Sequence, residues 1–465
     1  MGFLEKVYDK SPISIQNLMV SLSGYQKNRT RYGKTYYEYR KFLQDFDQWS
    51  LDDKLEYQKI ELIKFIRYAY EKSKFYQELY QGIDLDSIQS IYDLKKLPVV
   101  DKEMLRANIS KVYTIARKDG VEAHTGGTTG KSLNVLVTPE DSMCRMALLD
   151  HFKARLGFEH LKMKRATFNG KHIVPPAQKQ KVFWRYNAAC KQMIYSSFHL
   201  SEENMKCYVE SLNCYKPQAI DGFFMSMCDI ASYIERHNIK LQFRPIALFP
   251  TSETLTKAGR ELLERVFNCR VFDQYASSEG APFVTECEKQ KLHIEMASGV
   301  FEHLEEGNDE VLVTSFTTYG TPLIRYRIGD LMVFKNDGEI CDCGTESQLV
   351  KGIQGRKLDF LYTADGAKIN AGNVANLFKN MPNAIIRAQA IQDKMDKIKV
   401  LLEVDERLYK PEYDVLLTNE FLHKFGGKTK IIIEHVDEIP REKSGKFRLI
   451  KNTLVQHHHN QSLGE

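Results

Sequence analysis

The sequence lacks the features of a membrane-spanning, secreted or nucleic-acid-binding protein. No stretch reaches the roughly 18 consecutive apolar residues that a transmembrane helix needs. Residues 1–6 have neither the basic start nor the apolar core of a signal peptide. The net charge of +5 is small for 465 residues, and lysine and arginine are dispersed along the chain. These absences predict a cytoplasmic protein that has no membrane span and does not bind nucleic acid.

The cysteines give no sign of a disulfide framework. There are nine of them, an odd number, and they are scattered through a chain that carries no export signal. We therefore expect most of them to be reduced. Hydrophobic residues make up 43% of the chain and charged residues 27%, as in ordinary globular proteins. The length is sufficient for two or three domains.

A polar, glycine-rich stretch at residues 124–132, His-Thr-Gly-Gly-Thr-Thr-Gly-Lys-Ser, is suited to binding phosphate. Its glycines let backbone N–H groups approach an anion, its hydroxyls add donors, and its lysine adds positive charge. A Walker A loop would need glycine where Thr125 stands and would lead into a helix, whereas residues 133–138 are strand-like. We therefore predict a hairpin loop between residues 121–124 and 133–138. A polar turn without a ligand is the alternative.

Helix and strand patterns alternate between residues 139 and 272. Strands are expected at 165–168, 216–224, 245–249 and 270–272, and helices at 139–149, from 201 onward, at 227–234 and at 256–267. This alternation predicts parallel βαβ units, in which ligands collect at the carboxyl ends of the strands. Two polar clusters, residues 251–253 and 273–280, each follow a strand. We expect both clusters at that edge of the sheet.

The pattern becomes β-rich after residue 310 and then changes again. Strands are expected at 311–316 and 331–334, a linker at 352–356, and a smaller unit with strands at 397–404 and 429–436 around a helix. The predicted fold class is α/β. It comprises a large N-terminal domain, residues 1–353, with α/β subdomains of mixed and parallel sheets and a β-rich part. A small α+β C-terminal domain, residues 354–465, completes it.

Five segments, in this order, resemble the motifs of one enzyme family. They are Thr125–Lys131, Asp273–Glu279 (Asp-Gln-Tyr-Ala-Ser-Ser-Glu), Tyr326–Leu331 (Tyr-Arg-Ile-Gly-Asp-Leu), Gly355–Arg356, and Pro440–Lys446 (Pro-Arg-Glu-Lys-Ser-Gly-Lys). The chain resembles the adenylate-forming acyl ligases, and most closely the phenylacetate–CoA ligase-like branch that includes the CapK-type capsule-biosynthesis proteins. The resemblance extends from about residue 97 to residue 449.

The resemblance implies an ATP-dependent ligase that forms AMP. It implies a catalytic role for Lys446, which would bridge the substrate carboxylate and the α-phosphate. Glu279 would hold Mg²⁺ through a hard oxygen, and Asp330 would accept hydrogen bonds from both ribose hydroxyls. Arg356 would support the ribose or a phosphate. The remaining nucleotide-binding residues implied are Thr125, Gly126, Gly127, Thr128, Thr129, Gly130, Lys131, Ser252, Glu253, Asp273, Gln274, Tyr275 and Ser278, with Tyr275 stacking on adenine.

Structural explanations compete with these roles. Asp330 could cap a turn after Gly329, and Glu279 and Lys446 could be solvated surface charges. Residues 223–227 (Phe-Phe-Met-Ser-Met) resemble the turn that borders the family's acyl pocket, but a cluster of Phe and Met is more often plain core.

Three cysteines and a histidine form a candidate metal site. Cys341 and Cys343 lie in a Cys-Asp-Cys-Gly turn, and Cys287 and His293 lie earlier in a polar stretch. Three thiolates and one imidazole make a closed tetrahedral set for Zn²⁺, and relatives in the CapK-type branch carry a similar, structural arrangement. The alternative is free thiols in loops, because Cys-x-Cys is less diagnostic than paired Cys-x-x-Cys knuckles.

Two classes of function remain open from the sequence. One is a ligase that activates a carboxylic acid and passes the acyl group to the thiol of CoA, or to an amine or sugar of a capsule or lipopolysaccharide precursor. The other is a non-catalytic scaffold of the same fold, which is supported by Leu358 at a hinge position that is acidic in the family. Neither the acid nor the oligomeric state is predicted.

Overall fold

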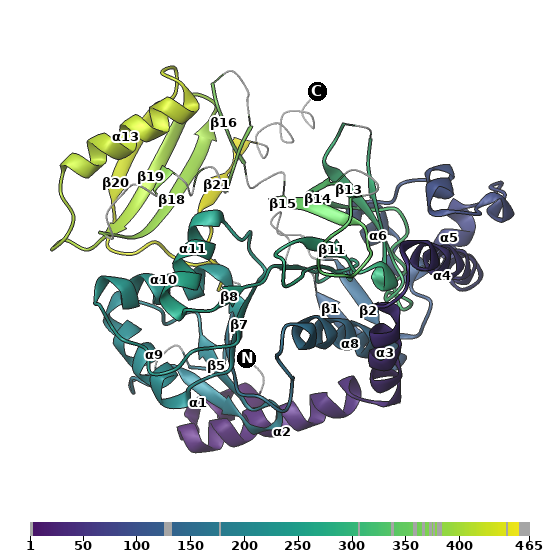
Figure 1. Ribbon diagram of the computed structural model, residues 1–465, viewed down its shortest axis with the longest axis horizontal. Coiled ribbons are helices and arrows are strands. Elements are labelled where there is room, and N and C mark those ends of the chain that lie inside the picture. Colours follow the sequence, from purple (N-terminus) through teal and green to yellow (C-terminus); the bar gives the residue numbers. More distant parts are fainter. Residues whose placement is uncertain are drawn as a thin grey trace.

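In the computed structural model, the described residues form three β-sheets of four or more strands, surrounded by helices (Figure 1). The structure describes residues 3–124, 133–175, 178–305, 307–335, 339–356, 360–364, 368–371, 374, 377–378, 384–442 and 445–454. Over those ranges, no helix combines the length and the apolar character that a bilayer crossing requires. The predicted phosphate-binding residues Thr125–Lys131 lie outside the described residues.

The N-terminal region is helical, and its helices from α3 onward pack on the largest core. Its helices are α1 (Phe3–Lys10), α2 (Ile13–Arg31), α3 (Lys34–Phe46), α4 (Leu51–Lys72), α5 (Lys74–Leu79), α6 (Lys102–Ala107) and α7 (Ile109–Val112). The start of α4 is fixed by Ser50, whose hydroxyl accepts a hydrogen bond from the Asp53 amide at 3.2 Å. Leu62, Phe65 and Ile66 on this helix are buried in the core that also contains strands of the seven-stranded sheet.

The six-stranded sheet confirms the predicted βαβ organisation. Its strand order is β4 (Trp184–Asn187), β5 (Gln192–Ser196), β3 (Arg165–Asn169), β6 (Ala219–Phe223), β7 (Ala247–Thr251), β8 (Arg270–Val271). All neighbouring pairs are parallel except β4–β5. The helices of this region are α9 (Glu202–Tyr215), α10 (Phe224–Arg236) and α11 (Lys257–Phe267). Phe223 and Thr251 are register partners at the ends of β6 and β7, so the residues directly after these two strands gather at one edge.

The seven-stranded sheet is antiparallel throughout. Its strand order is β12 (Gly299–His303), β13 (Glu310–Ser315), β14 (Tyr326–Phe334), β15 (Leu349–Arg356), β11 (Leu292–Ile294), β10 (Val284–Glu286), β9 (Gln274–Tyr275). The linker predicted at residues 352–356 is wrong, because these residues are the second half of β15 and pair with β14 through two register shifts. Local glycine content suggested a loop there, whereas pairing with a distant strand makes it part of the sheet.

The hairpin around the glycine-rich stretch is confirmed. Strands β1 (Val121–His124) and β2 (Asn134–Val137) pair antiparallel, with His124 opposite Asn134. Helix α8 (Pro139–Arg155) follows and is longer than predicted. Thr138 and Asp141 form a capping box at its start, which fixes the direction in which the chain leaves the hairpin.

The C-terminal part forms its own sheet and core, set apart from the other sheets in Figure 1. Strands β20 (Lys430–His435), β19 (Lys397–Val404), β18 (Ile385–Lys394) and β21 (Ile450–Asn452) lie in that order beside α13 (Glu412–Phe425), and β16 (Phe360–Tyr362) pairs with β17 (Lys368–Asn370). Val400, Leu417 and Phe421 are fully buried in this core. The domain boundary between residues 353 and 354 stays a prediction. From here on we call residues 360–454 the lid.

Candidate active site

The lid carries Lys446 to the carboxyl edge of the six-stranded sheet. The Nζ atom of Lys446 donates a hydrogen bond to the main-chain oxygen of Ser252 at 3.1 Å and lies 6.0 Å from the centre of the Phe223 ring. Phe223 ends β6, and Ser252 directly follows β7 with a left-handed φ of 70°. Such a backbone conformation in a non-glycine residue is uncommon and is enriched at functional sites. Lys446 and Ser252, both predicted site residues, therefore lie together.

Beside this lysine, Glu253 connects the lid to helix α10. Its carboxylate accepts hydrogen bonds from the amide of Met225, at the start of α10, at 2.8 Å, and from the amide of Phe447 in the lid at 3.1 Å. Burial raises the pKa of Glu253 to about 7. The hydrogen bonds from the Met225 and Phe447 amides, together with the positive charges of Arg441 and Lys446, oppose this shift. The sequence placed Glu253 near adenine; the structure places it between two main-chain segments that are far apart in the sequence.

A buried ion cluster also joins the lid to α10, and the sequence did not predict it. The Asp229 carboxylate on α10 accepts hydrogen bonds from Arg441 and, at 3.1 and 3.2 Å, from Arg387 of β18. Arg387 also pairs with Glu403 of β19 at 3.3 Å. Asp229 and Arg387 are almost fully buried. Of these residues, only Arg441 lies in a predicted motif, Pro440–Lys446. That motif was therefore the only sequence signal for this cluster.

The acyl-pocket interpretation of residues 223–227 is only partly compatible with their packing. Phe224 and Met227 are buried members of the hydrophobic core under the six-stranded sheet. This burial favours the core explanation for those two side chains. Phe223, which stands under Lys446, is not a member of that core cluster.

The predicted adenine and ribose residues lie on strands of the seven-stranded sheet. The hydroxyl of Tyr275 donates a hydrogen bond to Asp330 Oδ2 at 2.7 Å, and Asp330 is 6% exposed. Asp330 in β14 is the register partner of Arg356 in β15, so the main chain of Arg356 runs beside it. The ring of Tyr275 packs edge-on against Phe301, with centroids 6.0 Å apart. Tyr275, Asp330 and the backbone of Arg356 thus come together from three strands.

Asp273 and Gln274 lie at the junction of the two large sheets. The Gln274 side-chain amide donates to the Pro250 oxygen of β7 at 3.2 Å, and the Asp273 amide donates to Glu286 at 2.7 Å. Burial, reinforced by the charge of Glu286, raises the pKa of Asp273 to about 7. Arg260 contacts both oxygens of Glu286 at 2.9 Å and compensates its charge. These bonds fix Asp273 and Gln274 rigidly.

Ser278 and Glu279 line a small cavity against the hairpin that holds the glycine-rich stretch. The cavity is bounded by β2 on one side and by Ser278, Glu279 and Thr317 on the other. Arg145 of α8 holds this segment, since it donates to the Gly280 and Ala281 oxygens at 2.9 Å each. Glu279 is 6% exposed. The solvated-surface explanation therefore fails for Glu279, whose carboxylate lies beside the strand that leaves Thr125–Lys131.

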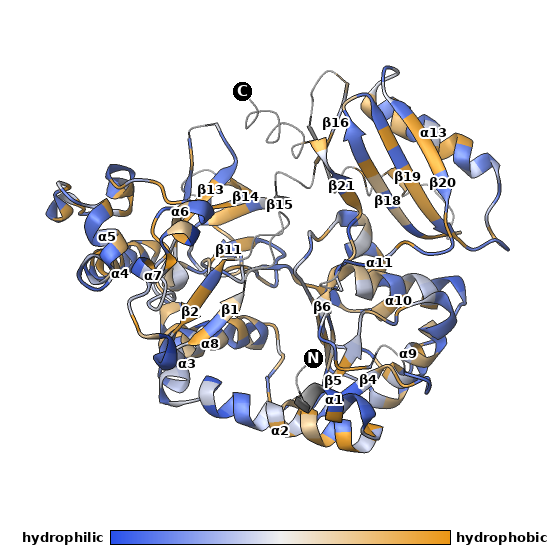
Figure 2. Cartoon of the chain, turned by 180° about the vertical axis from the view of Figure 1, so that it is seen from behind, coloured by the Kyte–Doolittle hydropathy of each residue, from blue (hydrophilic) through white to orange (hydrophobic). Residues whose placement is uncertain are grey.

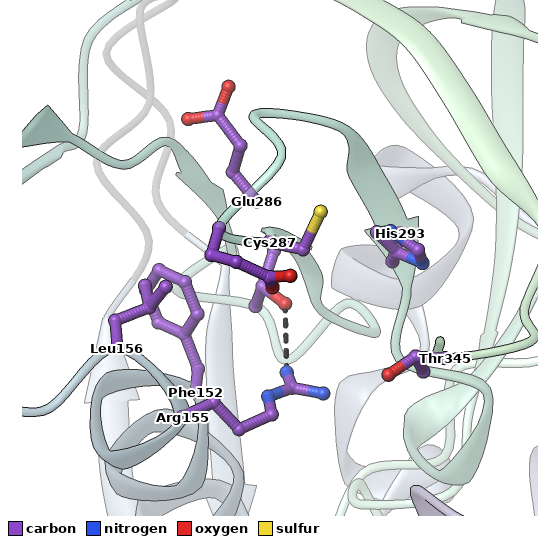
Figure 3. A pocket seen from close by; sticks show the side chains of 9 residues that line it. Phe152, Arg155, Leu156, Glu286, Cys287, His293 and Thr345 are labelled. Atoms are coloured by element: carbon purple, nitrogen blue, oxygen red, sulfur yellow. Dashed lines mark hydrogen bonds between the residues drawn. The ribbon is translucent and has the colours of Figure 1, made fainter. Parts of the chain in front are cut away.

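The four predicted metal ligands converge. One ligand atom from each of Cys287, His293, Cys341 and Cys343 lies within 4.8 Å of the others. The Sγ atoms of Cys287 and Cys341 are 3.7 Å apart, and Cys343 Sγ is 3.5 Å from His293 Nε2. The other ring nitrogen of His293 is 2.7 Å from the Ser347 hydroxyl, which orients the imidazole. Figure 3 shows Cys287 and His293 on the wall of the adjoining pocket, opposite Arg155.

This donor set suits zinc in number and kind. Cys287 follows β10, His293 lies in β11, and the two other cysteines lie in the turn before β15. Three segments of the seven-stranded sheet would therefore be joined by one ion. Lys446 and Ser252 come from other parts of the fold, the lid and the end of β7, which favours a structural rather than a chemical use of the ion.

Comparisons with known proteins agree with the resemblance. Residues 361–453 match the family described as the CapK C-terminal domain. The chain is 37% identical over 454 residues to Protein CapK of Staphylococcus aureus, covering 97% of this chain and all of that protein. Among solved structures, 2-hydroxyisobutyryl-CoA ligase in its postadenylation state with R3-HIB-AMP aligns with a TM-score of 0.71 at 15% identity, covering 90% of this chain and 93% of that one.

The same ligase in its thioesterification state, with 2-HIB-AMP and CoA, aligns with a TM-score of 0.54 at 15% identity, covering 90% of this chain and 94% of that one. At such identity these structures establish the adenylate-forming ligase fold, with a large N-terminal and a small C-terminal part. The match to Protein CapK extends over the full chain and establishes the family. The chain belongs to the CapK family.

Proposed function

We propose that this protein is an ATP-dependent, AMP-forming ligase that activates a carboxylic acid as an acyl-adenylate. The observation that carries this proposal is the position of Lys446, 3.1 Å from Ser252 at the carboxyl edge of the six-stranded sheet. Tyr275 of β9 and Asp330 of β14 form a hydrogen-bonded pair across the seven-stranded sheet, where a nucleoside could be held. The fold shared with 2-hydroxyisobutyryl-CoA ligase, seen with an acyl-adenylate, supports the same chemistry.

The proposed reaction begins with attack of a substrate carboxylate oxygen on the α-phosphorus of ATP. A new P–O bond forms, the bond to the bridging oxygen of the β-phosphate breaks, and pyrophosphate leaves with that electron pair. The Lys446 ammonium would offset negative charge on the carboxylate and the α-phosphate. Asp330 would hold the ribose hydroxyls, and Thr125–Lys131 would bind the β- and γ-phosphates. Mg²⁺ held by Glu279 would supply neutralising positive charge to the phosphates.

The lid orientation suits this first half-reaction. Glu253 and Asp229 bind the lid to the start and the middle of α10, and Phe447, bound by Glu253, is the residue next to Lys446. The better alignment with the ligase in its postadenylation state than in its thioesterification state supports an adenylate-forming orientation. We propose that residues 354–465 form a lid domain on residues 1–353, and that it turns away before the second half-reaction.

The acceptor in the second half-reaction is proposed by chemical class. CoA is present in two structures of the ligase with the same fold. A thiol attacks an acyl-adenylate readily, which supports an acid–thiol ligase. An amine or sugar of a capsule or lipopolysaccharide precursor is the second candidate. We also propose that Cys287, His293, Cys341 and Cys343 bind one structural Zn²⁺.

The deciding experiment is pyrophosphate exchange across a library of carboxylic acids. At least one acid should drive isotope exchange between pyrophosphate and ATP, and Lys446→Ala should abolish it. Lys451→Ala, which changes an exposed lysine of β21, is the matched control and should retain exchange. ATP binding without exchange for any acid would favour the scaffold alternative. Positive acids are then tested with CoA and with amines to identify the acceptor.

A further inference from the structure

Helix α2 faces the protein with its polar side and faces outward with its apolar side. It runs along the outer edge of the molecule beside the six-stranded sheet (Figures 1 and 2). Its buried residues are Gln16, Ser21 and Gly24, all polar or small. Four large apolar residues, one per turn, are exposed: Ile15 (45%), Leu18 (57%), Leu22 (58%) and Tyr25 (55%). We call these four residues the α2 stripe.

The polar inner face has a clear structural cause. Strand β4 is an edge strand, so one row of its backbone groups has no strand partner. Asn17 Oδ1 accepts from the Tyr186 amide at 2.9 Å, and the Ser21 hydroxyl accepts from the Ala188 amide at 3.0 Å. Gly24 allows close approach, because a Cβ there would lie 2.3 Å from the side chain of Asn187. Inner polar residues therefore cover the sheet edge.

The α2 stripe has no such explanation within the fold. Residues 15, 18, 22 and 25 are spaced three, four and three apart, so they lie on one side of the helix, opposite the inner face. An apolar surface of this kind on a protein exterior marks an interaction site. The spacing of the α2 stripe is typical of a helix that buries one apolar face, yet this face points away from the protein.

Charge identifies the partner. Helix α2 contains no Asp or Glu, and its last turns carry Lys27, Arg29 and Arg31, all exposed. Arg29 continues the line of the α2 stripe by one more turn. A symmetric pair of α2 helices would bring each basic end against the partner's basic end or against its positive N-terminal dipole, which disfavours self-association. An apolar stripe that ends in Tyr25 and Arg29, on a helix with a basic end and no acidic residue, instead suits an anionic lipid surface.

We propose that α2 is a membrane-docking helix, which lies flat on an anionic lipid surface with the α2 stripe in the headgroup–acyl boundary. Arg29, which is in line with the α2 stripe, contacts the lipid phosphates, whereas Lys27 and Arg31 lie on the other side of the helix and add only longer-range attraction. This docking is independent of the ligase chemistry, because the α2 stripe is not among the residues that hold Lys446, Asp330 or Glu279.

Co-sedimentation of the full-length protein with vesicles tests the proposal. Vesicles of phosphatidylcholine containing phosphatidylglycerol should bind the protein, pure phosphatidylcholine vesicles should bind much less, and added salt should release it. Leu18→Gln/Leu22→Gln should lower the partition coefficient by roughly tenfold or more, and Arg29→Gln should lower it by roughly fivefold. The control Val415→Gln/Leu416→Gln changes two exposed apolar residues of α13 and should bind like wild type.

Several results would overturn this proposal. Wild-type protein that fails to sediment, α2 variants that bind like wild type, or a control that loses binding equally would each do so. A concentration-dependent dimer that Leu18→Gln/Leu22→Gln abolishes, without vesicle binding, would instead assign the α2 stripe to contacts between copies. Pyrophosphate exchange should be unchanged in the α2 variants, so failure of docking and failure of the ligase proposal are separable.

Discussion

Lys446 and Ser252 are 194 positions apart in the sequence, yet the lysine Nζ atom lies 3.1 Å from the main-chain oxygen of Ser252. This contact places a cation of the lid at the edge where β6 and β7 end. It depends on two further contacts between the lid and α10, at Glu253 and at Asp229. The geometry of the candidate site therefore exists only in this orientation of the lid relative to the rest of the protein.

Replacing Lys446 by alanine should abolish adenylate formation while leaving the fold intact. Loss of one preorganised charge at a developing transition state typically costs about 2.7–4 kcal/mol, or roughly a hundredfold to a thousandfold in rate. The measurement is pyrophosphate exchange, with thermal melting as the test of folding. Lys451→Ala serves as the matched control. Wild-type exchange in Lys446→Ala would show that the lysine has no role in this step.

Replacing Asp229 by asparagine should weaken lid docking. Two guanidiniums, Arg387 and Arg441, would lose their shared carboxylate, and unpaired buried charge is costly. Adenylate formation should fall by at least about tenfold, while acyl transfer from a preformed adenylate should fall much less. Asp86→Asn, which breaks an exposed pair with Arg67, is the control and should change neither rate. Equal losses in both half-reactions would argue for a purely structural role of Asp229.

The buried carboxyl of Glu253 should make stability depend on pH. Its pKa rises from 4.5 to about 7 on folding, so the folded state binds the proton more tightly than the unfolded chain. The stability from this group is complete below pH 4.5 and is lost as pH rises toward 7, by up to about 3 kcal/mol. Asp273 and Glu302, with pKa values also raised to about 7, change stability in the same direction.

The contribution of Glu253 is isolated by comparing wild type with Glu253→Gln between pH 4.5 and 8. Glutamine carries no charge, so the stability difference between the two proteins should shift in favour of the variant as pH rises. Chemical denaturation at each pH gives this difference directly. A difference that stays constant across the range would mean that Glu253 does not titrate on folding.

The cysteine–histidine cluster should bind one zinc ion per chain and support folding. Metal analysis of purified protein should find one equivalent, and chelation should lower the melting temperature, because metal-binding free energy contributes to folding. Cys341→Ser should reproduce this loss, whereas Cys214→Ser, an exposed cysteine outside the cluster, should not. Absence of zinc together with unchanged stability on chelation would eliminate the site.

The sequence by itself determined the local elements and the order of the motifs. The hairpin of β1 and β2 and the βαβ units were predictable, because alternation, helical spacing and turn residues are properties of neighbouring positions. The four metal ligands could be proposed for a similar reason, since residue type alone restricts zinc coordination. The polar clusters after β7 and β8 were expected from a general rule for parallel sheets.

Tertiary structure decided everything that depends on distant partners. Residues 352–356 read locally as a glycine-containing linker, but strand β14 supplies the hydrogen bonds that make them part of β15. The two partners of Glu253 are separated from it by 28 and 194 positions, so neither its bridging role nor its raised pKa was visible in the sequence. The outward direction of the α2 stripe likewise arose only because β4 is an edge strand that needs polar partners. Local patterns fix which elements form, whereas burial and long-range pairing fix what each side chain meets.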